Sequence, residues 1–107
     1  MPFDINQTLK DMLQVIKTNV GDGWNKVKDT ANNFLQSRKE RLELLADLRI
    51  NNELENEFFV KRLADEKKIL ESELHALAVI SKSMAQKAAN AAIDVLENAV
   101  FKAINAI

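Results

Sequence analysis

Residues 76–107, ALAVISKSMAQKAANAAIDVLENAVFKAINAI, decide the fold prediction because they are apolar on more than one side of a helix. Alanine, valine, leucine, isoleucine, methionine and phenylalanine make up 21 of these 32 residues, and only five residues are charged. Their spacing places apolar side chains on two faces, so more than half of the circumference of a helix avoids water. A helix of this kind is normally surrounded by protein, in a bundle or at an interface between chains.

We expect this carboxy-terminal segment to form an interface between chains. The first 35 residues are amphipathic and too few to cover so large an apolar surface, so a lone chain would leave part of it bare. The expected partner is a second copy of the chain or another protein. The expected interface residues are Met84, Ala88, Ala91, Ala92, Ile93, Val95, Leu96, Val100 and Ile104.

The rest of the sequence also predicts an all-α fold. No glycine or proline occurs after Gly23, which leaves 84 consecutive residues without either of the strong helix breakers. Asp4 followed by Gln7 three residues later is the pattern of a capping box, so a first helix is predicted at about residues 5–20. The glycines of Gly21-Asp22-Gly23 predict a turn at 21–23.

The remaining chain reads as one long helix or several helices over about residues 24–106. A weaker break signal lies at 51–53, where the pair Asn51-Asn52 tolerates a turn. One helix over 24–106 would extend roughly 125 Å and could not bury its own apolar face. We therefore expect one domain at 1–107, folded as a helical hairpin or a three- to four-helix bundle and oligomeric, with an extended coiled-coil rod as the alternative.

A narrow apolar stripe with charged flanks is predicted to pack against a neighbouring helix. Leucines and a methionine recur every seven residues along it, which is coiled-coil spacing. Tryptophan 24, the only one in the chain, follows the first turn and is expected to anchor the first helix to the second. The expected helix-packing residues are Trp24, Phe34, Leu45, Phe59, Leu63, Leu70 and Leu77, with Met84 continuing the seven-residue repeat.

The residues that carry chemistry are few and scattered. The chain has no cysteine and one histidine, which disfavours thiolate chemistry and multi-histidine metal sites. Glu71 and His75 share a helical face, but a ferritin-like motif needs a glutamate where Ser72 stands, so a solvated histidine is expected. We predict no catalytic residue, no metal site, no cofactor and no small-molecule substrate.

The charged side chains are expected to serve the fold rather than a charged ligand. Residues 36–75 carry 18 of the 31 charged side chains, eight positive and ten negative. Glu66 and Glu73 border the apolar stripe and are expected to form ion pairs between helices, with Arg62, Lys67 or Lys68 as the cations. The basic residues of Ser37-Arg38-Lys39-Glu40-Arg41 are diluted by glutamates, which disfavours nucleic-acid binding.

These observations favour a non-catalytic structural or assembly protein that acts as a scaffold, an adaptor or a subunit through helix–helix interfaces. The alternative is an amphipathic helical protein that binds a membrane, lipid or polymer surface through Phe101, Ile104 and Ile107. No stretch has the length and apolarity of a spanning helix, and the start of the sequence lacks the pattern of a secretory signal. We expect a cytoplasmic protein.

Overall fold

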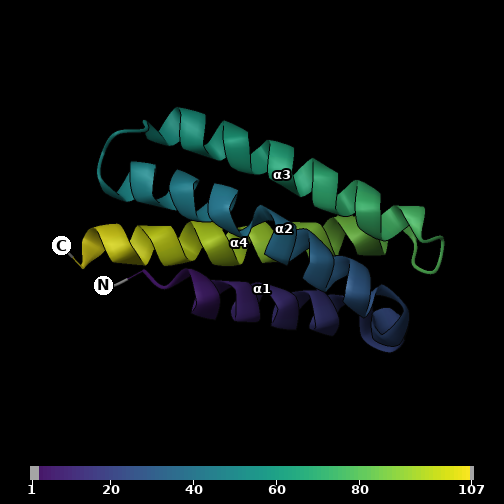
Figure 1. The fold of residues 1–107 in the computed structure, drawn as a ribbon. Coiled ribbons are helices and arrows are strands. Elements are labelled where there is room, and N and C mark those ends of the chain that lie inside the picture. Colours follow the sequence, from purple (N-terminus) through teal and green to yellow (C-terminus); the bar gives the residue numbers. More distant parts are fainter. Residues whose placement is uncertain (1–2, 107) are drawn as a thin grey trace.

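The computed structural model describes residues 3–106, which fold into four packed helices and contain no strand. The helices are α1 (Ile5–Val20), α2 (Trp24–Ile50), α3 (Asn56–Ala76) and α4 (Lys82–Asn105). Each helix runs antiparallel to the one before it, and α1 begins and α4 ends at the same end of the bundle as the α2–α3 connection (Figure 1). The chain measures 41 × 23 × 20 Å, so it folds back on itself and does not form the extended rod.

Side-chain caps fix the start of two helices. Asp4 Oδ1 accepts hydrogen bonds from the backbone N–H groups of Asn6 at 2.9 Å and Gln7 at 3.2 Å, as an N-cap residue should. The predicted capping box is only half formed, because the Gln7 side chain donates forward to Asp11 and not back to the cap. At the start of α4, Ser81 Oγ accepts from the backbone N–H of Met84 at 3.1 Å.

The first turn depends on two glycines for different reasons. Residues Gly21–Gly23 form a single 3-10 turn, η1, between α1 and α2. Gly21 has φ of +55°, a conformation that L side chains rarely adopt. At Gly23 a Cβ atom would lie 2.9 Å from Ile80 Cγ2, so only glycine lets η1 approach the α3–α4 connection this closely.

The second turn lies at the weaker break signal and is closed by Asn52. This asparagine has φ of +60°, and its N–H donates to the Arg49 carbonyl while the Glu53 N–H donates to the Leu48 carbonyl. These two hydrogen bonds define a Schellman motif, in which asparagine replaces the usual glycine. The chain therefore reverses between α2 and α3.

The sequence did not predict the third turn, residues 77–81. The prediction that the seven-residue repeat forms a stripe along a single helix is therefore wrong. Leu77 caps the end of α3 and Met84 lies in α4, on the other side of the turn. Ala78 closes α3 with φ of +57°, and its N–H donates to the His75 carbonyl at 3.0 Å. An alanine in this conformation costs roughly 1 kcal/mol more than a glycine. Because alanine is not a residue type that marks a left-handed turn, the sequence shows no turn signal here.

Ala78→Gly is expected to stabilise the fold by about 0.5–1 kcal/mol, because it removes the steric cost of a left-handed Cβ at an exposed site. The free energy of unfolding from urea titration followed by circular dichroism measures the gain. Ala64→Gly, inside α3, is the matched control and should destabilise the fold by a similar amount. A loss of stability in Ala78→Gly would contradict the strained turn.

The apolar carboxy-terminal segment lies inside the bundle. α4 packs against each of the other three helices and most extensively against α1; the two lie side by side in Figure 1. Small side chains allow this close packing, since five alanines of α4 are fully buried: Ala85, Ala88, Ala89, Ala92 and Ala103. Within residues 3–106, no helix combines the length and apolarity needed to cross a membrane.

Candidate functional site

The residues expected at an interface between chains divide into two groups. Five are buried inside the single chain, as part of the bundle core, and the other four are partly buried on the flanks of α4. Helices α1, α2 and α3 therefore cover most of the α4 surface that was expected at an interface, and Phe101 of the same segment stays exposed. The buried group is Ala88, Ala92, Ile93, Leu96 and Val100, and the partly buried group is Met84, Ala91, Val95 and Ile104.

The expected helix-packing residues all contribute to the bundle interior, to different degrees. Five of them are buried: Phe34, Leu45, Phe59, Leu63 and Leu70. Trp24 and Leu77 are partly buried and pack against the edge of the core. Both lie where a helix begins or ends, so they cover the turns at that end of the bundle.

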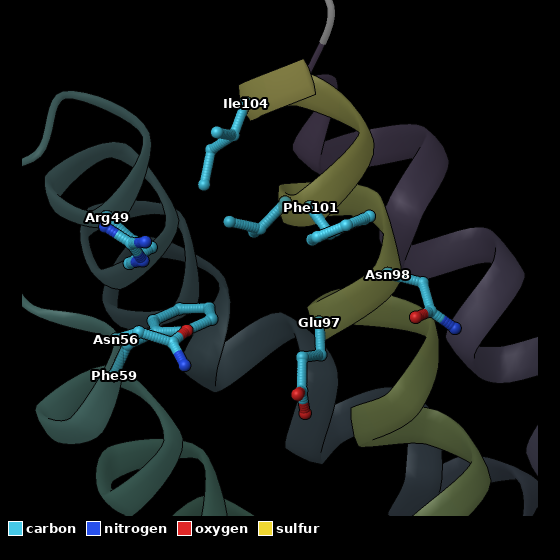
Figure 2. Close-up of a pocket in the computed structure, with 8 residues that line it drawn as sticks. Arg49, Asn56, Phe59, Glu97, Asn98, Phe101 and Ile104 are labelled. Carbon is cyan, nitrogen blue, oxygen red and sulfur yellow. The ribbon is translucent and has the colours of Figure 1, made fainter. Parts of the chain in front are cut away.

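The clearest concave surface is a groove at the end of the bundle where α2 ends, α3 begins and α4 ends. Its volume is about 540 Å³. Figure 2 shows Phe59 at its base, Arg49 on the α2 side, and Glu97, Phe101 and Ile104 along α4. Asn56, Asn98 and Val100 complete the lining. We call this surface the end groove.

The end groove combines an apolar floor with one exposed aromatic ring. Phe59 and Val100 are each 1% exposed, so the floor belongs to the bundle core. Phe101 is 63% exposed, the highest value among the large apolar side chains that remain on the surface. Isolated surface apolar residues are ordinary, but an exposed ring beside an apolar groove is typical of a binding surface.

Two opposite charges line the end groove without an ion-pair partner among residues 3–106. Arg49 and Glu97 are both partly buried, on α2 and α4 respectively. Arg49 donates one hydrogen bond, from Nη1 to the Leu54 carbonyl at 3.3 Å, and its Nε is buried without a partner. Buried polar atoms normally have a hydrogen-bond partner, so the Arg49 Nε in particular has interaction capacity left.

Glu66 forms the one ion-pair cluster that joins two helices among the described residues. Its side chain is 1% exposed, and its Oε1 accepts from Arg41 Nε at 2.6 Å while its Oε2 lies 3.4 Å from Arg38 Nε. The expected interhelical ion pair is therefore present, but its cations come from α2 and not from Arg62, Lys67 or Lys68. The cluster ties α2 to α3 and uses two of the three cations of the basic segment 37–41.

The remaining chemical candidates do not form a cluster of metal ligands within residues 3–106. His75 is exposed and Glu71 partly buried, and both line a shallow pocket with Lys68, Ser72, Lys82 and Gln86. Glu73 is exposed on α3. Within residues 3–106, no three histidine, aspartate or glutamate side chains gather as metal ligands would.

Sequence reasoning missed the end groove, although one signal pointed to it. Arg49 lies seven residues after the buried Leu42, so it occupies the apolar stripe of α2. Arg38 interrupts the same stripe, and it is one of the two arginines that reach Glu66. A charge inside an apolar stripe requires a partner, and Arg49 has no carboxylate partner within the described chain.

No protein-family model, no curated protein and no solved structure matches this chain. Its function must therefore be argued from the site.

Proposed function

We propose that this protein is a non-catalytic assembly protein, a helical bundle that associates with other protein through the end groove. The observation that carries the proposal is the pairing of a strongly exposed Phe101 with a groove of apolar floor and polar walls that no residue of the described chain fills. Aromatic residues and arginine are the side chains most enriched at the energetic centres of protein interfaces. The end groove presents both, because Arg49 forms its opposite wall.

The composition of the end groove suits binding better than bond-breaking chemistry. Its polar lining consists of Arg49, Asn56, Glu97 and Asn98. An acid–base or nucleophilic mechanism needs a reactive side chain held within hydrogen-bond reach of a second group. No hydrogen bond joins any two of these four side chains to each other, and the one hydrogen bond that Arg49 makes, to the Leu54 carbonyl, leaves its Nε without a partner.

A photo-crosslinking residue placed at position 101 in cells tests the assembly proposal. We expect a protein adduct at this position, because the ring would lie against a partner. The same residue at position 14, an exposed glutamine on α1, is the matched control and should give no specific adduct. Equal labelling at positions 101 and 14 would contradict a dedicated binding surface.

Binding to a lipid or polymer surface is the second candidate, favoured by the exterior of α2 and α3. Four large apolar side chains are exposed there, Leu44 at 58%, Phe58 at 50%, Val60 at 40% and Ile69 at 36%. Basic side chains accompany them, and Lys61 Nζ lies 5.8 Å from the centre of the Phe58 ring. Exposed apolar residues with nearby cations suit an anionic surface. Lipid adducts from a crosslinker at position 58, with no protein adduct at 101, would favour this candidate.

A further inference from the structure

The end groove has the features of a surface that meets a copy of itself. A two-fold interface requires one patch to be self-complementary, so that residue i of each chain contacts residue j of the other. Such a patch needs a protruding group and a recess, and a positive charge with a negative one. Phe101 and the apolar floor supply the first pair, while Arg49 and Glu97 supply the second.

We propose that the occupant of the end groove is a second copy of this chain, related by a two-fold axis. The Phe101 ring of each copy enters the groove of the other, and Arg49 of each copy forms an ion pair with Glu97 of the other. This inference rests on the proposed assembly function and names its partner.

Charge complementarity favours a second copy over an unrelated partner. Arg49 and Glu97 line the same groove, and neither forms an ion pair with any residue of 3–106. A purely acidic or purely basic partner would satisfy only one of them and repel the other. In a two-fold dimer, Arg49 of each chain meets Glu97 of the other, so both charges are paired and two equivalent ion pairs form.

The expected dimer is a weak one. A standard interface buries about 800 Å² per partner, which would be about an eighth of the 6469 Å² that the chain exposes, and the eight residues of the end groove present much less than that. Contacts centred on one aromatic ring and two ion pairs belong at the small end of the range, where association is transient. The dimer should therefore form at micromolar and higher concentrations.

Sedimentation equilibrium over a wide concentration range tests the dimer directly. The average mass of the natural chain should rise from 12.1 kDa toward twice that value. Phe101→Ser should abolish the rise and leave the helical circular dichroism unchanged, because the ring is exposed. Phe58→Ser removes the other strongly exposed phenylalanine and should leave the dimer intact. A mass that stays at 12.1 kDa at all concentrations would overturn the proposal.

A charge exchange tests the pairing between chains. Glu97→Arg should raise the dimer dissociation constant by about tenfold or more, because it places two cations together across the two-fold axis. Adding Arg49→Glu to this variant should restore dimerisation. If instead the two charges paired within one chain, the single change would lower the thermal midpoint and leave the mass unchanged, which would overturn the contact proposed here.

Failure of the dimer and failure of the assembly function give different results. A chain that stays monomeric but forms a crosslink from position 101 to another protein would overturn the two-fold dimer and retain the assembly function. A monomeric chain with no protein adduct at position 101 would overturn both. A dimer that Phe101→Ser does not weaken would place self-association on another surface and overturn the end-groove contact.

Discussion

Leu96→Asp is expected to unfold the whole chain, with loss of most of the helical circular dichroism signal at every protein concentration. Leu96 is 0% exposed near the middle of α4, the helix that packs against all three others. An aspartate there would bury a charge without a partner, and because its side chain is smaller than that of leucine it would also leave a cavity in the core. Together these two costs reach about 5 kcal/mol or more, which is comparable to the whole stability of a small domain near the low end of the typical range of about 5–15 kcal/mol.

This variant separates a core position from an interface position. If Leu96 belonged to an interface between chains, the aspartate would dissociate an oligomer whose subunits keep their helices. Asn90→Asp places the same charge at an exposed position of α4 and should leave both fold and mass unchanged. Circular dichroism together with light scattering distinguishes the two cases, and a folded, lighter Leu96→Asp would return the residue to an interface between chains.

One unsignalled turn explains most of the difference between expectation and structure. The all-helical fold follows from the absence of breakers, and the two turns marked by Gly21 and Asn52 lie where residue types favour positive φ. Ala78 also has a positive φ, but alanine is not a residue type that predicts this conformation. Without this turn, α3 and α4 read as one rod whose apolar end lies bare. With it, α4 folds back and is covered.

The sequence predicts that Glu66 forms an ion pair with another helix, but it does not identify the residues that supply the cations. The position of Glu66 at the edge of an apolar stripe predicted an interhelical ion pair. Its partners, Arg38 and Arg41, are more than 20 residues away, and only the reversal between α2 and α3 brings them together. For the same reason, Arg49 in the apolar stripe of α2 signals an unmet partner but does not locate the end groove, whose walls come from the ends of three helices.

Removing both arginines from Glu66 is expected to destabilise the fold by about 3 kcal/mol. In the double variant Arg38→Ala and Arg41→Ala, a carboxylate that is 1% exposed loses both of its cations. An uncompensated buried charge typically costs about 3–5 kcal/mol, and the lower value applies because Arg41 is itself 52% exposed and already meets water. The free energy of unfolding from urea titration measures the loss.

The exposed pair between Lys61 and Glu57 provides the control for this measurement. Both side chains are at least two-thirds exposed, so Lys61→Ala should change stability by less than about 0.5 kcal/mol. A loss as large as that of the double variant would indicate a general effect of removing surface cations.

Adding Glu66→Met to the arginine double variant should recover most of the lost stability, because it removes the stranded charge and fills the same space with an apolar side chain. The alternative is that the arginines stabilise the fold through their own packing, since the Arg38 guanidinium lies 5.8 Å from the centre of the Phe34 ring. In that case the methionine would recover nothing. Recovery by Glu66→Met would therefore show that the arginines stabilise the fold through the Glu66 carboxylate. It would also show that an apolar contact at this position holds α2 against α3 nearly as well as the charge cluster does.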